Sequence, residues 1–232
     1  MPFSAARIPP FSLSFAYFLG YMLGDGYTSA RAHPVIGMTC HSVDEEQFCM
    51  TVLVPLIQEL FGINPCVYKK KNQNAIAVTF GSRKVLSYLT SIIRFPLGQA
   101  KKTVPEWITE SSMKVKVAFI KGLFDADGCL VFSRKHLVKE SYPSIELKSV
   151  DRDVLTWVVS TLRELNFRVT LGRSVESWVL RINGDKMLLR WMNVIGTNNL
   201  KHKSKYAVWQ KLGYCPHGTT VPDRLRLLSQ VP

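Results

Sequence analysis

The sequence lacks the cysteine patterns of a zinc finger or of a disulfide-stapled domain. Its five cysteines, Cys40, Cys49, Cys66, Cys129 and Cys215, are odd in number and contain no CxxC pair. Widely scattered cysteines of this kind indicate reduced thiols in an intracellular compartment. Low-complexity tracts are also absent, and the hydrophobic share of 47% is that of an ordinary folded chain.

Long hydrophobic runs are scarce as well. The most apolar stretch, Phe11–Leu23, follows two prolines, lacks a strongly basic leader and runs into Gly24-Asp25-Gly26. Because a membrane helix needs about 20 apolar residues, this stretch predicts a buried core helix. We therefore expect neither a membrane segment nor a signal peptide.

Acidic residues are few relative to basic ones. Thirty Lys and Arg stand against 17 Asp and Glu, a formal net charge of +13 with a pI near 9.7. This excess indicates a polyanionic partner, nucleic acid before a membrane or another acidic surface. Residues 1–110 carry 10 basic and 7 acidic groups, and residues 111–232 carry 20 and 10. At +10 against +3, the second half is expected to contribute more of the phosphate affinity.

The chain repeats itself once. Phe18–Gly26 (FLGYMLGDG) aligns with Ile120–Gly128 (IKGLFDADG) at an offset of 102 positions, from 18 to 120. Cys40–Asp44 aligns with Leu147–Asp151 at an offset of 107, from 40 to 147. Each half then continues with a helical pattern, two short strands, a second helical pattern and a basic segment. Five phrases in register indicate a tandem duplication.

The repeat predicts the order of the elements. Helices are expected at 45–61 and 152–166 and at 83–93 and 186–195, with strands at 65–71, 75–80, 167–173 and 178–182. We therefore expect an α+β fold of two αββαββα units, residues 1–108 and 109–232, related by a pseudo-twofold axis. Gly81-Ser82 and Asn183-Gly184 occupy equivalent strand-to-helix turns, where helix capping or a positive φ is wanted.

Small residues in both motifs predict that two helices meet there. Gly20 and Gly24, like Gly122 and Ala126, lie four positions apart and share one helix face. Two such faces allow two backbones to approach closely. Because a glycine inside a helix costs about 1 kcal/mol relative to alanine, a repeated pair implies a packing role.

An aspartate ends each motif. Asp25 and Asp127 precede Gly26 and Gly128, which we expect to cap the helices. Carboxylates at two helix C-termini oppose the helix dipoles, and a divalent cation relieves that conflict. A single Asp-Gly is a common turn, whereas a matched pair at a helix seam favours metal binding.

These residues resemble the LAGLIDADG motif, the signature of homing endonucleases encoded in introns and inteins. Ile120–Gly128 is the closer match, while Phe18–Gly26 keeps its two helix glycines, its aspartate and its final glycine. The resemblance runs from about Ser14 to Leu212, and segments such as 55–60 look like single-chain archaeal intron enzymes. No flanking splicing blocks are seen, which favours an intron-encoded form over an intein.

The resemblance implies a fold and an activity. The motif helices would pack together, and two antiparallel sheets would form a saddle over the major groove of DNA. A monomer would cut both strands of a long, asymmetric duplex site with Mg²⁺ and leave short 3′ overhangs. Mn²⁺ would substitute, and Ca²⁺ would bind without efficient cleavage. We expect an intracellular, cytoplasmic protein of a prokaryote, archaeal by its resemblance.

The resemblance also implies metal ligands. Asp25 and Asp127 would bind the metal, helped by the carbonyl groups of Gly24 and Ala126. Each metal would polarise a phosphate and help to generate the attacking hydroxide.

Further catalytic residues follow by position. His41 and Lys148 correspond to the polar strand residue near each metal, with Cys40 and Leu147 as the alternative register. A basic residue late in each half would tune the water network and stabilise phosphorane charge; these are Lys203 and either Lys101 or Lys102. Since His41 stands opposite Lys148, equal cleavage rates for the two strands are in doubt.

DNA contacts are expected on strands and turns, because alternation directs one face of each sheet to DNA. Arg or Lys would pair with guanine and Asn or Gln with adenine, while other lysines would hold phosphates. Each charge could equally be a solvated surface residue. The expected set is Arg31, Lys69, Lys70, Lys71, Asn72, Arg134, Lys135, Lys139, Arg168, Arg173 and Arg181.

Two other functions fit the same resemblance: an RNA-splicing maturase, and a catalytically inactive DNA-binding protein of the same fold. Retention of both Asp25 and Asp127 argues against the second, and nothing in the sequence excludes a maturase role beside cleavage. The target sequence cannot be read from the chain, because base recognition depends on side-chain pose, water and DNA bending.

Overall fold

The boundary between the two compact units lies inside the second repeat. The computed structural model describes residues 6–29, 33–95, 101–134 and 139–230. Its compact units are Met1–Ala126 and Asp127–Pro232, whereas the sequence halves were expected to meet after residue 108. Helix α6 (Met113–Asp127) explains the difference, because it begins the second repeat yet packs on α1 (Leu13–Asp25).

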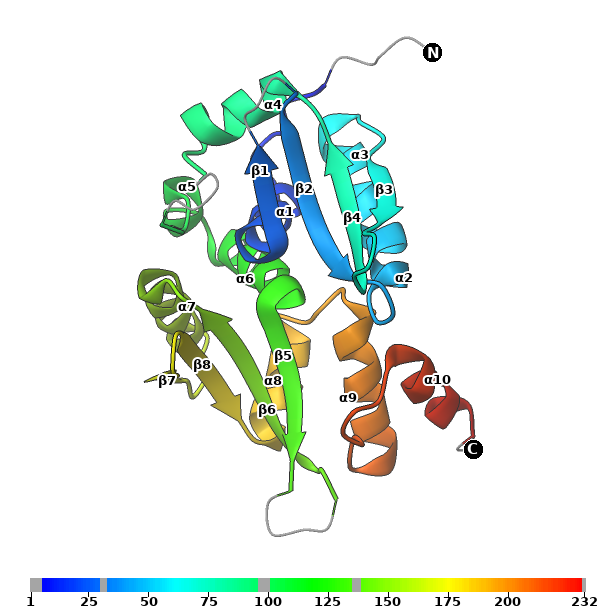
Figure 1. Ribbon diagram of the computed structural model, residues 1–232. Helices are drawn as coiled ribbons and strands as arrows, with labels where there is room; N and C mark the ends of the chain where they lie inside the picture. Colours follow the sequence, from blue (N-terminus) through cyan, green and yellow to red (C-terminus); the bar gives the residue numbers. More distant parts are fainter. Residues whose placement is uncertain (1–5, 30–32, 96–100, 135–138, 231–232) are drawn as a thin grey trace. The chain divides into compact units, whose positions relative to one another are not determined.

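The first unit is built on a four-stranded antiparallel sheet in the order β1-β2-β4-β3, which Figure 1 shows side by side. Its strands are β1 (Gly26–Ser29), β2 (Val35–His41), β3 (Cys66–Lys69) and β4 (Ala75–Phe80). Its helices, besides α1 and α6, are α2 (Glu46–Phe48), α3 (Val54–Phe61), α4 (Arg83–Ser87) and α5 (Glu106–Thr109). The π-helical segments Cys49–Leu53 and Tyr88–Ile92 make the two expected helical runs continuous.

The second unit repeats this topology with the strand order β5-β6-β8-β7. Its strands are β5 (Gly128–Ser133), β6 (Tyr142–Ser149), β7 (Thr170–Arg173) and β8 (Trp178–Asn183). Its helices are α7 (Arg152–Glu164), α8 (Asp185–Val194), α9 (Leu200–Leu212) and α10 (Val221–Gln230). The α+β class and the two αββαββα units are confirmed, and α9 and α10 extend beyond them.

Helix α1 forms the centre of the first core. The Ser12 hydroxyl starts the helix by accepting a hydrogen bond from the amide of Phe15 at 3.2 Å. Every residue from Phe15 to Leu23 is buried, and Phe18 meets Phe61 of α3 edge-on at 5.1 Å between ring centroids. Across the described residues, no helix combines the length and the apolar character needed to cross a membrane.

The expected special turns are present. Ser82 caps α4 by accepting from the amide of Val85, and Gly184 before α8 has φ of +94°. Gly26 is the C-cap residue of α1, as expected: its amide donates to the carbonyl oxygen of Met22, and with φ of −83° it also begins β1. It is required for space, because a Cβ there would lie 2.6 Å from the Cα of Met22. Gly128 likewise begins a strand, β5.

Alternation gives each sheet a face covered by helices and an open face. In β2, Ile36, Met38 and Cys40 are buried towards the helices. We define the first open face, from the strand register, as Tyr27, Ser29, Val35, Gly37, Thr39, His41, Cys66, Tyr68, Ala75, Ala77 and Thr79. The second open face is defined likewise as Cys129, Val131, Ser133, Tyr142, Ser144, Glu146, Lys148, Thr170, Gly172, Val179, Arg181 and Asn183. Gly37, Ala77 and Val179 belong to these faces by register but are buried.

Candidate metal site and nucleic-acid interface

The two motif helices cross with their backbones in contact. A Cβ on Gly20 would fall against the carbonyl oxygen of Phe119, and one on Gly122 against the carbonyl oxygen of Tyr17. The amide nitrogens of Leu123 and Tyr21 would each lie 2.9 Å from those Cβ positions. These contacts map onto each other under the 102-residue offset, since 119 − 17 and 123 − 21 both equal 102. The expected helix seam and its local twofold symmetry are therefore confirmed.

A buried carboxylate within the second motif was not assigned a role from the sequence. Asp125 is 0% exposed, and its Oδ2 accepts a hydrogen bond of 2.6 Å from the hydroxyl of Tyr17. A buried carboxylate is costly unless it is hydrogen-bonded, so this bond ties α6 to α1. At the matching position in the first motif the residue is Leu23. The pair is therefore an asymmetric polar contact at a symmetric seam.

The end of α1 combines a carboxylate with a carbonyl group that is hydrogen-bonded to a lysine side chain. Asp25 is the last residue of the helix. The carbonyl oxygen of Gly24 accepts a hydrogen bond from Nζ of Lys102 at 3.3 Å. Oxygen ligands of these two kinds are those that Mg²⁺ prefers. The donor types at this helix end would suit a hard divalent cation, and the Lys102 amine lies on the same carbonyl oxygen.

Tyr21 lies on α1, four residues before Asp25. Burial, followed by the nearby Cys40, Asp25 and Glu45, raises the pKa of Tyr21 well above its ordinary value. Its hydroxyl lies 3.4 Å from Sγ of Cys40. The phenol therefore remains protonated at neutral pH and is unsuited to act as a general base.

Strand alternation separates His41 from Cys40. Cys40 is 2% exposed on the helix-covered face, whereas His41 is exposed on the first open face. Nδ1 of His41 accepts from the amide of Asp44 at 3.3 Å, so the neutral ring carries its proton on Nε2. All five cysteines are free thiols, as expected.

In the second half, the two alternative strand residues, Lys148 and Leu147, also lie on opposite faces of the sheet. Lys148 is exposed on the second open face, and Leu147 is 2% exposed against the helices. Asp127 is the last residue of α6, and Ala126, before it, is buried. Among the described residues, no three His, Cys, Asp or Glu side chains gather as a metal cluster. The expected ligand set of one carboxylate and one carbonyl group per half does not require such a cluster.

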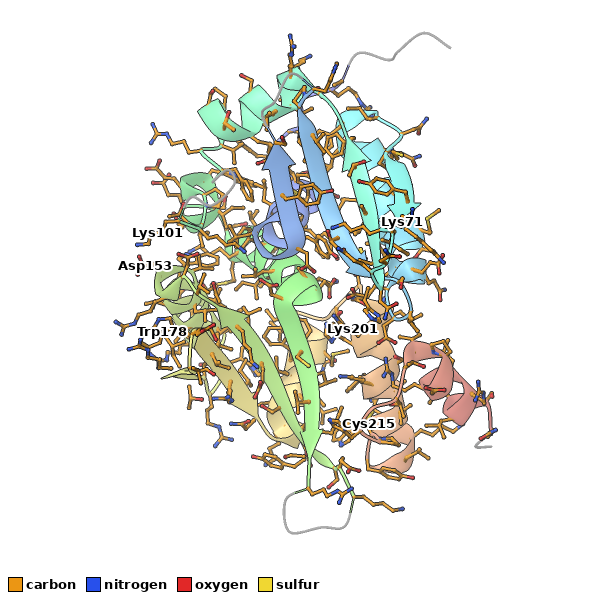
Figure 2. The ribbon with its side chains drawn as sticks, viewed as in Figure 1. Lys71, Lys101, Asp153, Trp178, Lys201 and Cys215 are labelled. Carbon is orange, nitrogen blue, oxygen red and sulfur yellow. The ribbon has the colours of Figure 1, made fainter. Side chains whose placement is uncertain are left out.

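The expected late lysines lie on different local structures. Lys203 is exposed on α9, and Lys205, two residues further along, donates from Nζ to the carbonyl oxygen of Leu130 in β5 at 2.9 Å. Lys101, labelled in Figure 2, is exposed outside any helix or strand. Of the two candidates in the first half, Lys102 is the one whose amine reaches Gly24.

The expected DNA contacts of the first half lie on both faces of the sheet. Nζ of Lys70 donates to Oγ1 of Thr39 at 3.1 Å and lies 5.6 Å from the ring centroid of Tyr27, on the first open face. Lys69 instead pairs with Glu46 of α2 at 3.4 Å. Lys71 and Asn72, with φ of 57°, form the exposed turn that follows (Figure 2). Arg31 lies outside the described residues.

In the second half, the expected contacts separate in the same way. Arg181 is on the second open face, paired with Glu146 at 2.8 Å, whereas Arg173 is in register with Trp178 on the opposite face. Arg134 pairs with Glu140 at 2.6 Å. Nζ of Lys139 lies 4.4 Å from the ring centroid of Tyr214, Arg168 lines a pocket, and Lys135 lies outside the described residues. The roles of all these residues stay predictions.

Comparisons with known proteins show the fold of the chain and a family match within its second half. Residues 114–196 match the family described as LAGLIDADG-like domain. A structure of I-DmoI with its nicked target DNA and Mn has a TM-score of 0.58 at 21% identity, covering 80% of this chain and 96% of that one. Other I-DmoI structures are with DNA and Ca or Mg. The N-terminal LAGLIDADG domain of DUF199/WhiA has a TM-score of 0.55 at 17% identity, covering 84% of each chain.

One curated relative carries a different name. The tRNA-splicing ligase RtcB of Methanopyrus kandleri is 23% identical over 205 residues, which is 78% of this chain. The match covers only 20% of that protein, so this chain spans about a fifth of its length. The name tRNA-splicing ligase therefore describes that much longer protein and is not transferred to this chain.

Proposed function

We propose that this chain, which carries a LAGLIDADG-like domain and has the two-motif LAGLIDADG fold, is a site-specific endonuclease that cuts both strands of duplex DNA. Its substrate would be a long, asymmetric site, bound by a monomer and cut with divalent metal to leave short 3′ overhangs. Mg²⁺ would be the working ion, with Mn²⁺ as a substitute.

The reciprocal crossing of the motif helices is the observation that supports this proposal most. Asp25 follows Gly20 by five positions, and Asp127 follows Gly122 by five. Each aspartate is the last residue of its helix, where the helix dipole is negative. An apolar residue would serve better there if packing were the only purpose, so the matched carboxylates favour cation binding.

In the first half, the residues around Gly24 would have different catalytic roles. Asp25 and the Gly24 carbonyl group would hold the cation, which when bound supplies Lewis-acid activation of a phosphate. Lys102 keeps a positive charge beside that carbonyl group and would stabilise the charge that develops on the phosphate. His41, with its proton on Nε2, would donate a hydrogen bond towards a water or a phosphate oxygen.

In the second half, Asp127 and the Ala126 carbonyl group would take the same role. Lys148, exposed on the second open face, corresponds to His41, and Lys203 is the basic residue late in this half. A lysine ammonium group can only donate hydrogen bonds, whereas an imidazole ring with its proton on Nε2 offers one donor and one acceptor. The two half-sites would therefore differ in hydrogen bonding and cut their strands at different rates.

The test replaces each aspartate with asparagine, which keeps the shape and removes the charge. The substrate is a supercoiled plasmid carrying the genomic DNA on either side of the intron that holds the coding region, joined as if that intron were absent. With Mg²⁺, Asp25→Asn and Asp127→Asn should cut more than about 100-fold more slowly, since metal stabilisation is worth several kcal/mol. Asp153→Asn, on the exposed first turn of α7, is the matched control and should cut like the parent.

Binding separates this proposal from its alternatives. Both asparagine variants should keep their affinity for the plasmid insert in gel shifts, and Ca²⁺ should support binding without efficient cleavage. Specific binding by the parent without cutting under any metal would leave an inactive DNA-binding protein, which the fold allows. Undiminished cleavage in excess EDTA, or by either asparagine variant, would exclude the proposed chemistry.

A further inference from the structure

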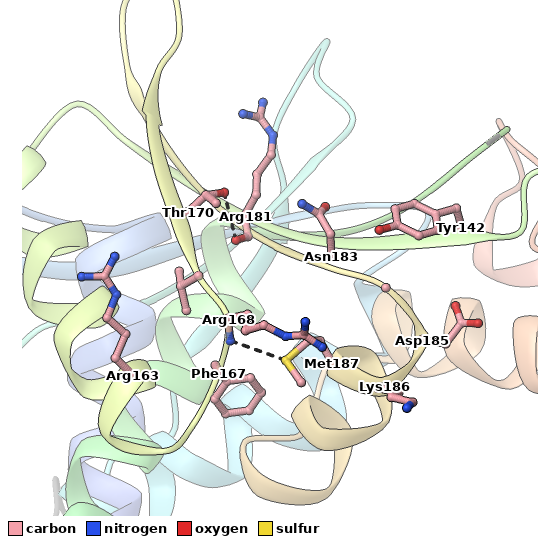
Figure 3. A pocket seen from close by; sticks show the side chains of 12 residues that line it. Tyr142, Arg163, Phe167, Arg168, Thr170, Arg181, Asn183, Asp185, Lys186 and Met187 are labelled. Atoms are coloured by element: carbon pink, nitrogen blue, oxygen red, sulfur yellow. Dashed lines mark hydrogen bonds between the residues drawn. The ribbon is translucent and has the colours of Figure 1, made fainter. Parts of the chain in front are cut away.

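A pocket occupies one corner of the second sheet. It encloses about 690 Å³ where β7 begins, β8 ends and α8 begins (Figure 3). Phe167 and Met187 form apolar wall, and the sulfur of Met187 accepts from the amide of Arg168 at 3.5 Å. Small-molecule sites of this size are lined mainly by apolar side chains. Here most of the lining residues are polar or charged, which favours a ligand with polar groups.

The lining is strongly cationic. Arg163, Arg168, Arg181 and Lys186 contribute to it, against Asp185 as the one acidic group. Arg181 is paired with Glu146. Within the described ranges, the side chains of Arg163, Arg168 and Lys186 make no ion pair, and all three are exposed. Figure 3 draws Asp185 at the Lys186 end of the pocket and Arg163 at the opposite end. An anion entering at the arginine end would therefore meet positive charge.

The pocket adjoins the second open face. Thr170 and Arg181, which are partners in the sheet, belong to both, as does Asn183. Along β6, this corner is marked by Tyr142, six residues from Lys148 (148 − 142). At about 3.3 Å per residue, the separation is about 20 Å. Since each nucleotide advances a DNA strand by about 3.4 Å, the separation equals about six base pairs.

The first unit does not repeat the two arginines, although Arg83 and Lys84 stand at the start of α4. The phrase Gln58-Glu59-Leu60 matches Arg163-Glu164-Leu165 at an offset of 105, and no residue from Gln58 to Asn64 is basic. Nε2 of Gln58 donates to Oδ1 of Asn64 at 2.9 Å, so its polar end is already engaged. The two arginines were therefore not needed to form the shared fold.

We propose that this pocket binds a phosphodiester group of the DNA backbone, about six base pairs from the Lys148 end of the second open face. The inference rests on the proposed function and deepens it. The planar guanidinium groups of Arg163 and Arg168 suit a phosphate because they can donate two parallel hydrogen bonds. The contact fixes the register of the duplex on the sheet and reads no base.

The first experiment measures how affinity for a random-sequence duplex falls with salt. In Arg163→Gln/Arg168→Gln, the log–log slope should become shallower by about 0.9 for each phosphate that the variant no longer neutralises. Arg83→Gln/Lys84→Gln removes two charges at the corresponding turn of the first unit and is the matched control. An unchanged slope in the pocket variant, or an equal change in the control, would overturn the proposal.

The second experiment needs no duplex. Dimethyl phosphate, a model phosphodiester, is titrated into the full chain at low salt while the amide resonances of Thr170 and Gly184 are followed by NMR. Both should shift and saturate in the parent, and the shifts should be lost in Arg163→Gln/Arg168→Gln and weakened in Lys186→Gln. No shift in the parent excludes an anion site. Inorganic phosphate binding more tightly than dimethyl phosphate, with no change in the DNA salt slope, would assign the pocket to a free phosphate instead.

Cleavage and pocket binding are read separately. If the parent cuts no DNA but both pocket experiments come out as expected, the pocket is established and the endonuclease proposal fails. If cutting depends on Asp25 and Asp127 while the pocket variant behaves like the parent, the pocket proposal alone fails. Arg163 and Arg168 are exposed, so the double variant should keep the parent's circular dichroism spectrum.

Discussion

The two sheets have the same topology and differ in the chemistry of their open faces. At the centre of the first, Thr39 is in register with Ala77; at the centre of the second, the matching pair is Glu146 and Arg181. The helix-covered faces, by contrast, are apolar in both, as Met38 and Ile145 illustrate. Packing against the helices constrains every second residue of a strand, and the residues between them are free to adapt to a ligand. A duplicated fold can thus keep one core pattern while its halves meet different parts of a ligand.

The first open face carries two tyrosines, Tyr27 and Tyr68, and fewer charged side chains than the second. Tyr27 covers Gly37, where a Cβ would lie 2.6 Å from its hydroxyl oxygen. Burial, followed by the neighbouring Tyr68, raises the pKa of Tyr27. This face therefore offers neutral hydrogen-bond donors and aromatic surface, whereas the second offers charged groups. The difference agrees with net charges of +3 and +10 for residues 1–110 and 111–232.

The largest effect is expected where the halves are alike. Gly20→Ala and Gly122→Ala should each lower the free energy of unfolding by about 1–3 kcal/mol or more. Each new methyl group meets the backbone of the other helix, and this outweighs the gain of about 1 kcal/mol in helix propensity. Gly172→Ala, with open space around its Cβ, is the control and should change stability by less than about 0.5 kcal/mol. Urea unfolding measures all three, and a neutral Gly20→Ala would contradict the close crossing.

The next effect concerns Lys102, the lysine beside the proposed metal ligands Asp25 and Gly24. Lys102→Met should slow cleavage about 10-fold to 100-fold, the usual consequence of removing a group that supports a metal ligand. Lys101→Met should slow it less, because the Lys102 amine is the one on the Gly24 carbonyl group. Single-turnover cleavage at saturating Mg²⁺ compares them. A larger loss for Lys101→Met would reverse this assignment.

A third effect would sharpen the contrast between the open faces. Arg181→Gln should cost about 1–3 kcal/mol of specific binding and relax the preference at one base pair. Glu146→Gln should have the same sign and a smaller size, since Glu146 positions the guanidinium at 2.8 Å. Ala77→Ser, at the matching place in the first sheet, should have little effect. Competition binding with every position of the target randomised measures the preferences, and equal losses in both sheets would remove the contrast.

The smallest effect is expected at a surface ion pair of the first unit. Lys69 and Glu46 are 66% and 52% exposed, so solvent screens their attraction. Lys69→Gln should change the free energy of unfolding by less than about 1 kcal/mol, and less at high salt. Because the Lys69 side chain is directed to α2, Lys69→Gln should weaken DNA binding less than Lys70→Gln on the first open face. Thermal unfolding and gel shifts at two salt concentrations would reveal a larger role.

The duplication and the helix seam could be predicted because they rest on repeated spacings. Gly20 and Gly122 mark the crossing, and Ser82 and Gly184 mark equivalent turns. What could not be predicted depends on strand parity and on distant partners. Arg173 and Arg181 look alike in sequence, and only the register of the β7–β8 hairpin places them on opposite faces.

Buried polar groups were equally hard to foresee. Asp125 lies two positions before the predicted ligand Asp127, yet it faces Tyr17, 108 residues away. No local pattern marks a carboxylate whose partner lies on another helix. The choice between Lys101 and Lys102 had the same difficulty, since one residue's shift in an irregular segment decides which amine reaches Gly24.

Helix α6 completes the core of one half and leads directly into the sheet of the other, for Gly128 begins β5 immediately after Asp127. A gene cut at the repeat boundary, after residue 108, would encode an N-terminal fragment without the helix that covers Gly20. That fragment would expose the seam face of α1 and would recruit an equivalent helix from another chain. A single repeat would thus leave this face of α1 uncovered unless a second chain supplied a helix to it.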